Sequence, residues 1–221
     1  MTTILLARHG QSDWNVARRW QGHADRPLTE AGRAQADALA ERLADIEIDV
    51  VYASDLRRAR ETAEAVARRK GLAVEVVPEL REVDVGSWSG LTRAEAEEVF
   101  PQGFRRWLGG GPGWDDGETY EEMAARVERV VRAIAAKRPH GRVLVVSHGG
   151  PIRAVHALAL GLGVHTYRRM RPVEPNARLS AVCIEDGRFT ELCPASELDE
   201  LLARDQAARI AAGTQPPSPG G

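Results

Sequence analysis

The residues of this chain that could do chemistry together are two histidines, each directly after an apolar run. Arg8-His9-Gly10 follows the first run, and His148-Gly149 follows the most apolar one. A lone histidine in such a place is usually structural, but here each is followed by glycine, which lets a backbone approach a ligand closely. A neutral imidazole can attack phosphorus, and the planar fork of an arginine grips two phosphate oxygens at once. The pattern therefore indicates phosphoryl transfer through one of the two histidines.

Besides the nucleophile, phosphoryl transfer needs cations around the non-bridging oxygens and an acid for the leaving oxygen. Arginine and protonated histidine can supply that positive charge, so the chemistry needs no metal ion. The two cysteines, Cys183 and Cys193, are ten positions apart, with no C-x-x-C motif or Cys/His cluster nearby. We expect both to be buried free thiols and predict neither a disulfide nor a metal site.

The elements that must position these residues alternate between strands and helices. Apolar runs predict strands, and apolar residues at helical spacing predict helices. The predicted strands are 3–7, 50–53, 74–77 and 142–147. The predicted helices are 29–44, 56–70, one after Thr119 and one directly after the strand 142–147. Because the strands are apolar on both faces, we expect a three-layer αβα sandwich with a mostly parallel central sheet. Strand-like segments on both sides of Asp186-Gly187 predict a hairpin at a C-terminal edge.

The length suits one domain, which we place at residues 1–212. Open α/β sheets bind ligands beyond the carboxyl ends of their strands, where both histidines fall. The stretch 88–117 is irregular around a glycine-rich centre, although Thr92 begins a capping box. We interpret about 91–117 as an insertion or lid over the strand ends. The Pro/Gly/Ser-rich residues 213–221 predict a flexible tail.

Composition limits the classes of partner. The 221 residues contain 30 Lys and Arg against 32 Asp and Glu, a net charge of −2, which offers no basic footprint for nucleic acid. No apolar run is long enough to span a membrane, and the N-terminus shows no signal-peptide pattern. We therefore expect a cytoplasmic enzyme with a small-molecule substrate and no nucleic-acid or membrane partner. A homodimer is our working hypothesis for its assembly.

Residues 6–15, LARHGQSDWN, resemble the L-x-R-H-G-x-[ST]-x-x-N signature of the histidine phosphatase (phosphoglycerate-mutase-like) superfamily, branch 1. The resemblance continues, in family order, through residues 21–22, 27–32, 54–63, 80–90, 117–119 and 146–150. R-H-G alone would be weak evidence, whereas the ordered set is specific. It implies the αβα fold of that superfamily and a phosphohistidine mechanism with neither a metal nor a diffusible cofactor.

The resemblance also implies a role for each matching residue. His9 corresponds to the nucleophile, and Glu82 to the group that protonates the leaving oxygen and later activates water. The groups expected on the phosphoryl oxygens and the substrate are Arg8, Arg58, His148, Asn15, Gln21, Gly22 and Gly149.

Neighbouring residues offer alternative interpretations of these assignments. Arg57 is as cationic as the arginine beside it, and Glu79 and Asp84 share the loop of the predicted acid. Asn15 could instead cap the turn that follows it.

The loop after the predicted acid separates phosphatase from mutase. Phosphoglycerate mutases of this superfamily typically follow that glutamate with Arg-x-Tyr-Gly, but here Val83-Asp84-Val85 follows, as in the phosphatase branch. We therefore favour a phosphomonoester hydrolase for a small phosphorylated metabolite, such as a phosphoglycerate or sugar-phosphate derivative. A 2,3-bisphosphoglycerate-dependent phosphoglycerate mutase stays an alternative. A non-catalytic phospholigand-binding relative is a further one, although the intact set of expected residues argues against it.

Three arginines of the insertion bear on the substrate. Arg93, Arg105 and Arg106 lie where the mutase carries cationic residues for a carboxylate. Arg105-Arg106 is offset and could be ordinary surface charge. If the three face the pocket, the substrate carries a carboxylate or a second phosphate.

Overall fold

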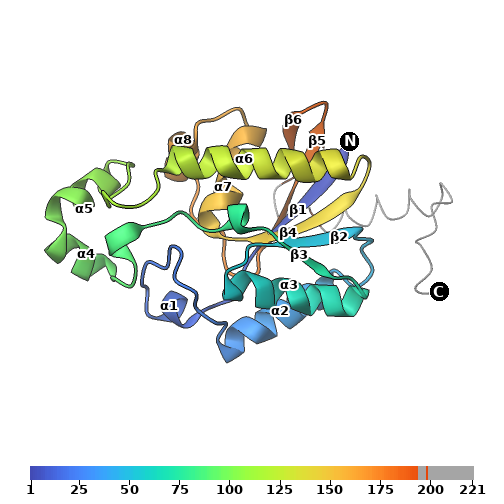
Figure 1. Ribbon diagram of the computed structural model, residues 1–221, viewed down its shortest axis with the longest axis horizontal. Helices are drawn as coiled ribbons and strands as arrows, with labels where there is room; N and C mark the ends of the chain where they lie inside the picture. Colours follow the sequence, from blue (N-terminus) through green and yellow to red (C-terminus); the bar gives the residue numbers. More distant parts are fainter. Residues whose placement is uncertain (194–197, 199–221) are drawn as a thin grey trace.

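The computed structural model describes residues 1–193 and Leu198. Among these residues, six strands form one sheet in the order β3-β2-β4-β1-β5-β6 (Figure 1). The strands are β1 (Thr2–Arg8), β2 (Val50–Ala53), β3 (Val74–Val76), β4 (Arg142–Ser147), β5 (Leu179–Glu185) and β6 (Arg188–Cys193). The first four in spatial order run parallel, while β5 pairs antiparallel with β1 and β6 antiparallel with β5. The predicted mostly parallel sheet with a C-terminal hairpin is confirmed.

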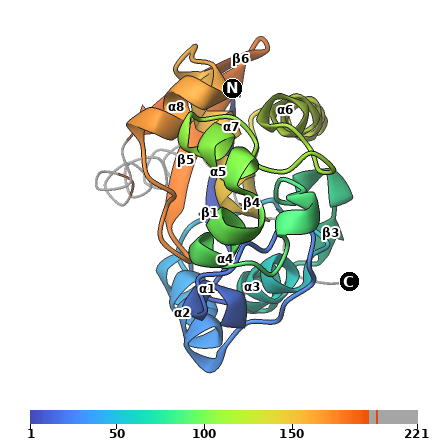
Figure 2. The ribbon, with the colours of Figure 1, turned by 90° about the vertical axis from the view of Figure 1, so that its left-hand side faces the viewer.

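Helices cover both faces of the sheet (Figures 1 and 2). One face carries α2 (Glu30–Arg42) and α3 (Arg57–Lys70), and the other carries α6 (Tyr120–Lys137), α7 (Gly149–Ala159) and α8 (Val164–Met170). Successive residues of β1 point to opposite faces, so Leu5 packs with the α2/α3 side and Leu6 with the α6/α7 side. The αβα sandwich is therefore held by two apolar clusters, one on each face.

Local signals explain where the elements begin and end. The Thr29 side chain accepts a hydrogen bond from the backbone of Gly32 at the start of α2, and α6 begins with a complete capping box at Thr119. Gly71 ends α3 with φ +67°, a left-handed conformation that favours glycine. Asp186 also has a positive φ in the β5–β6 turn, as expected of a tight hairpin.

The stretch 88–117, expected to be irregular, contains two helices. They are α4 (Arg93–Val99), opened by a capping box at Thr92, and α5 (Pro101–Leu108), which starts at a proline. Trp88 is fully buried against the rings of Phe104 and Trp114, and this aromatic packing gives the stretch a core of its own. The expectation of an irregular segment was wrong because short helices can be stabilised by burial of a few large side chains.

Several expectations concern the end of the chain. Cys183 is a buried free thiol, as predicted, while the side chain of Cys193 and the predicted tail 213–221 lie outside the described residues. The proposed domain end at 212 lies there too. Among the described helices, none is both long and apolar enough to cross a membrane.

Candidate active site

The two histidines meet because β1 and β4 are neighbouring parallel strands. Arg8 is in register with Ser147, and the next backbone N–H, that of His9, donates to the Ser147 carbonyl at 3.0 Å. The rings of His9 and His148 are consequently 5.1 Å apart between centroids, tilted by 56°. Both side chains are buried, with exposed fractions of 2% and 0%.

His9 is held in the form that a nucleophile needs. Its Nδ1 lies 2.7 Å from the carbonyl oxygen of Gly10, and because a carbonyl only accepts, Nδ1 carries the proton and Nε2 keeps its lone pair. Burial lowers the pKa of His9 well below its ordinary value, and the charges of Arg58 and Arg8 lower it further. The imidazole is therefore neutral near pH 7, with Nε2 available for attack.

Arg58 reaches the site from the first turn of α3 and is 1% exposed. Its guanidinium donates to the carbonyls of Ala24 at 2.7 Å and Gly22 at 2.9 Å. Burial lowers its pKa to about 10, so it stays cationic at neutral pH. The adjacent Arg57 is exposed and pairs with Glu61. The structure therefore places Arg58, the arginine that matches the family motif, beside the histidines, and not Arg57.

The loop between α8 and β5 closes the site from the other side. Arg8 donates to the carbonyl of Glu174, and Asn176 donates to the His9 carbonyl at 3.0 Å. Burial lowers the pKa of Arg8. Sequence analysis missed this loop, although its two prolines, Pro172 and Pro175, directly before a strand mark a segment of fixed shape.

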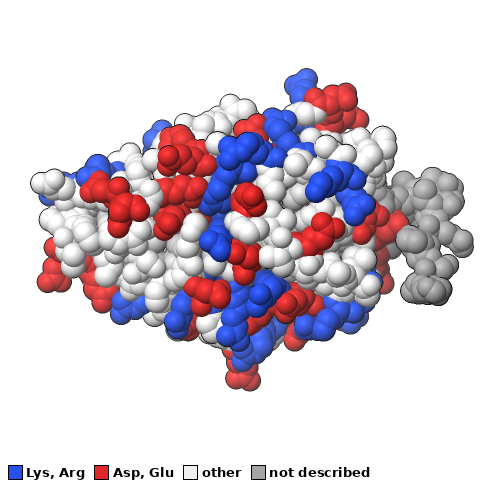
Figure 3. All heavy atoms as spheres, in the orientation of Figure 1, with Lys and Arg blue, Asp and Glu red and all other residues white. Residues whose placement is uncertain are grey.

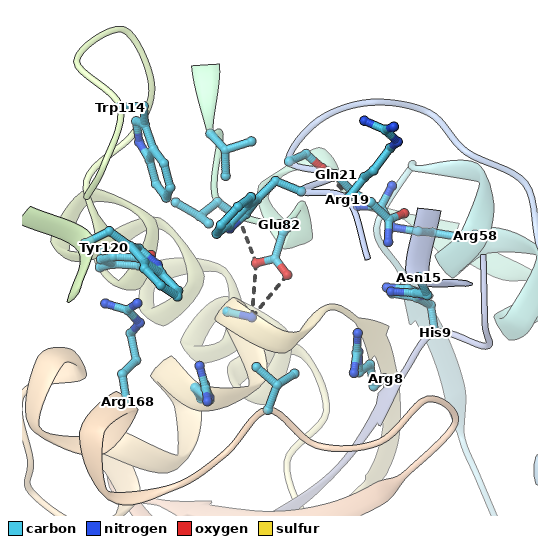
Figure 4. A pocket seen from close by; sticks show the side chains of 18 residues that line it. Arg8, His9, Asn15, Arg19, Gln21, Arg58, Glu82, Trp114, Tyr120 and Arg168 are labelled. Carbon is cyan, nitrogen blue, oxygen red and sulfur yellow. Dashed lines mark hydrogen bonds between the residues drawn. The ribbon is translucent and has the colours of Figure 1, made fainter. Parts of the chain in front are cut away.

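Glu82 is anchored by backbone donors. The N–H groups of Val83 and Gly150 donate to its Oε1 at 2.9 and 3.0 Å (dashed in Figure 4). Arg126 supports the same loop from α6, because it donates to the Glu82 carbonyl at 2.8 Å and pairs with Glu118. The carboxylate thus lies at the start of α7, bound to the backbone N–H two residues after His148.

The competing carboxylates of that loop lie elsewhere. Glu79 is exposed on the surface, and Asp84 lines a different hollow beside α6. Of the three acids considered from sequence, only Glu82 lines the cavity that contains His9.

The side-chain amides of Asn15 and Gln21 each accept a hydrogen bond that holds the local fold, and both residues also line the cavity. The Oδ1 of Asn15 accepts from the backbone of Ser12 at 3.0 Å, and the Oε1 of Gln21 accepts from the Ser12 hydroxyl at 2.8 Å. Both oxygens are therefore occupied, which leaves the NH₂ groups as donors for an anion. Gly22 has φ +48°, and a Cβ there would lie 2.6 Å from Val85 Cγ2, so glycine is needed at this turn.

These residues surround a cavity of about 250 Å³ (Figure 4). Arg8, His9 and Arg58 lie on one side of Glu82, and Tyr120 and Arg168 on the other. The described residues that line it are Arg8, His9, Asn15, Arg19, Trp20, Gln21, Gly22, Arg58, Glu82, Val83, Val85, Trp107, Trp114, Tyr120, Gly150, Arg153, Arg168 and Val173. The cavity is strongly cationic, although the face of the molecule in Figure 3 mixes acidic and basic side chains.

Residues 4–195 match the sequence model of the histidine phosphatase superfamily, branch 1. The chain belongs to this superfamily. Its relatives include phosphoserine phosphatase 1 of Hydrogenobacter thermophilus, 34% identical, with the match covering 76% of this chain and 80% of that protein. Glucosyl-3-phosphoglycerate phosphatase of Mycobacterium tuberculosis is 38% identical, with coverage of 73% and 76%. A probable phosphoglycerate mutase, GpmB of Erwinia tasmaniensis, is also 38% identical, with coverage of 77% and 80%.

Solved structures of the superfamily share the fold. The mycobacterial glucosyl-3-phosphoglycerate phosphatase in complex with VO3 superimposes with a TM-score of 0.78 at 34% identity, covering 87% of this chain and 98% of that one. Bacillus stearothermophilus YhfR gives a TM-score of 0.82 at 30% identity, covering 88% and 97%.

Two of the expected residues of this histidine phosphatase are not among the residues that line the cavity. His148 is fully buried beside His9, and neither of its ring nitrogens has a hydrogen-bond partner in the described part of the chain. Burial, followed by the charge of Arg58, lowers its pKa well below the ordinary value. Gly149 is also buried and does not line the cavity, whereas Gly150 does.

Of the two interpretations of the insertion's arginines, the structure favours surface charge for Arg105 and Arg106 over a place in the pocket. Arg93 stacks over the rings of Phe104 and Trp107, and Arg106 pairs with Asp115. Arg105 is exposed, and none of the three arginines lines the cavity. The reason is the rotation of α5, which turns its aromatic residues inward and its two consecutive arginines outward.

The cavity does contain further arginines, which the sequence analysis missed. Arg153 on α7 and Arg168 on α8 line the cavity, together with Tyr120 at the start of α6. Neither arginine lies in a local pattern that reveals its direction, because it is the packing of three helices that brings them to one wall.

Proposed function

We propose that this histidine phosphatase hydrolyses small phosphomonoesters through a phosphohistidine on His9. The observation that carries the proposal is the buried imidazole of His9, with its Nδ1–H bound to the Gly10 carbonyl and its Nε2 free, beside Arg8 and Arg58. A buried neutral nucleophile next to two cations suits attack on a dianionic phosphoryl group. The relatives named phosphatases, one of them a metal-independent phosphoserine phosphatase of Arabidopsis thaliana, support the reaction class.

The first half-reaction transfers the phosphoryl group to the enzyme. The Nε2 lone pair of His9 forms a bond to phosphorus while the bond to the ester oxygen breaks, and protonated Glu82 gives its proton to that oxygen, which leaves as an alcohol. Arg8 and Arg58 donate to the non-bridging oxygens, and His148 adds an N–H from beside the nucleophile.

The second half-reaction restores the enzyme. Glu82, now a carboxylate, takes a proton from water, and the oxygen of that water bonds to phosphorus as the N–P bond breaks. Inorganic phosphate leaves, and both Glu82 and His9 return to their starting protonation states. The cycle balances without a metal ion or an added co-reactant.

The cavity wall beside Glu82 favours hydrolysis over mutase chemistry. Val83 and Val85 line the cavity where mutases of the superfamily carry the Arg and Tyr of Arg-x-Tyr. At these two positions the cavity offers neither a guanidinium nor a phenol hydroxyl to hold the dephosphorylated alcohol, which favours its replacement by water before a second transfer.

The test uses enzyme in EDTA with p-nitrophenyl phosphate and a panel of phosphoesters, wild type beside His9→Ala, with 3-phosphoglycerate to 2-phosphoglycerate conversion followed in parallel. We expect phosphate release that disappears in His9→Ala. Rapid interconversion stimulated by 2,3-bisphosphoglycerate, with little release, would instead establish a mutase. No turnover in either assay would favour a binding relative. The cytoplasmic location, the homodimer, the 1–212 domain and its lid stay predictions from the sequence.

A further inference from the structure

The part of the cavity beyond Glu82 holds two cations that the phosphoryl chemistry does not use. Arg153 comes from α7 and Arg168 from α8, and both line the cavity. In Figure 4 Arg168 and Tyr120 lie on the side of Glu82 that faces away from His9. A phosphoryl group on His9 would place its leaving oxygen near Glu82, so the rest of the ester extends toward these arginines.

Both guanidiniums are held in place by groups that leave their charge uncompensated. Arg153 donates to the Arg171 carbonyl at 2.8 Å, and its Nε is buried with no hydrogen-bond partner. Arg168 donates to the Gly110 carbonyl at 2.7 Å, and its guanidinium carbon lies 3.3 Å from the centroid of the Tyr120 ring. Within the described residues, neither forms an ion pair with a carboxylate.

Other arginines near the cavity differ in this respect. Arg19 also lines it but pairs with Glu95, and Arg126 behind the Glu82 loop pairs with Glu118. Burial lowers the pKa of Arg153 and the charge of Arg168 lowers it further, while burial also lowers the pKa of Arg168. Two partly desolvated like charges on one wall are unfavourable by themselves, and an anion between them offsets that cost.

We propose that Arg153 and Arg168 recognise a second anionic group, a carboxylate or a phosphate, on the leaving-group part of the substrate. The proposal rests on the proposed phosphatase function and narrows its substrate class. A guanidinium held by one backbone carbonyl still presents further N–H donors, in the planar geometry that matches a carboxylate or phosphate. The rings of Tyr120 and Trp114 lie on the same side of Glu82 as Arg168 (Figure 4), and such rings strengthen a charged pair by reducing its contact with water.

The test compares esters that differ in the second anion alone. O-phosphoserine and O-phosphoethanolamine differ by a carboxylate, as do 3-phosphoglycerate and glycerol 3-phosphate, while fructose 1,6-bisphosphate and fructose 6-phosphate differ by a phosphate. For each pair, the ratio of the two kcat/KM values measures recognition of the added anion. Each ester is also tested as a competitive inhibitor of p-nitrophenyl phosphate hydrolysis, which measures its binding even if it is turned over slowly.

In at least one pair, we expect wild-type enzyme to favour the ester that carries the second anion by about tenfold or more in kcat/KM. Charge-assisted hydrogen bonds discriminate by about that amount. A preference in the first two pairs identifies a carboxylate, and one in the third a phosphate. Arg153→Met and Arg168→Met should each reduce the ratio about tenfold, mainly through KM, and Arg168→Lys should restore part of it. Arg169→Met, an exposed neighbour on α8, is the matched control and should retain the wild-type ratio.

Two results would overturn the proposal. Wild-type enzyme could show no preference in any pair, in kcat/KM or in inhibition. Alternatively, the Arg153 and Arg168 variants could lower kcat/KM by the same factor for both esters of a pair, which would mean a structural role for the arginines. Either result leaves the proposed function standing as long as p-nitrophenyl phosphate hydrolysis depends on His9, so the two failures are distinguishable.

Discussion

Gly150→Ala is the sharpest test of the position of Glu82. A methyl group at Gly150 would overlap Glu82 Oε1 and lie 3.1 Å from Sδ of Met123 and 3.4 Å from the carboxyl carbon of Glu82. Because Gly150 lies in the first turn of α7, where alanine is favourable, the backbone should keep its shape and the carboxylate should move. We expect a displacement of roughly half an ångström to an ångström, which costs catalysis by a misplaced group on the order of 10²-fold.

The assay separates the acid role of Glu82 from general damage. The alkoxide of an alkyl phosphate is a poor leaving group that needs a proton, whereas p-nitrophenolate leaves readily without one. kcat/KM for glycerol 3-phosphate should therefore fall about 10²-fold in Gly150→Ala, and that for p-nitrophenyl phosphate much less. Glu82→Gln should show the same selectivity, because it removes the proton and keeps the shape.

Gly163→Ala is the matched control, since a Cβ there meets no atom within 4 Å. It should leave both rate constants and the melting temperature near those of wild type. The reasoning would be refuted if Gly150→Ala, folded as judged by its melting temperature, kept alkyl phosphate hydrolysis within a few-fold of wild type. An equal loss on both esters would likewise contradict an acid role for Glu82.

Three further outcomes are expected. Arg58→Lys should lower kcat/KM about 10²-fold, because lysine cannot hold two carbonyls and a phosphate together, while the exposed Arg57→Lys should have little effect in the same assay. Burial lowers the pKa values of His9 and His148, so below about pH 6.5 the unfolded state binds more protons than the folded state. Urea titrations should therefore show the free energy of unfolding falling as the pH drops below that value, and a flat profile would contradict this. Trp88→Ala should destabilise the protein by about 3–5 kcal/mol in the same titrations.

The phosphate-binding half of the site could be predicted because its residues sit next to strong local signals. Arg8 and His9 end one apolar strand, His148 follows another, and Arg58 opens a helix that ends at a glycine. The parallel sheet then brings the ends of neighbouring strands together by a general rule of such folds. Strand order places Arg8 and the two histidines together, whereas Arg58, on a helix, was assigned only by the resemblance to the superfamily.

The substrate half could not be predicted, because its geometry depends on helix rotation and on contacts far apart in sequence. Arg105 and Arg106 are adjacent to Phe104, and the rotation of the helix about its own axis decides which of the three side chains point inward. In the structure Phe104 is buried and both arginines are exposed. Arg168 reaches the cavity only because α8 packs beside α6, an arrangement that no pattern within α8 specifies.

The arginines of the cavity bear on the proposed nucleophile as well as on the proposed ligand. Of the described residues that line it, five are arginines and Glu82 is the one acid, so the cavity is positive in a chain whose net charge is −2. Burial holds the pKa of His9 down, and the charges of Arg58 and Arg8 lower it further, which favours an unprotonated Nε2. The other three arginines of the cavity do not contribute to that shift, but they add to the positive field that would attract a phosphate dianion. Two arginines thus bear on His9 and on the anion together, while the remaining three bear on the anion alone.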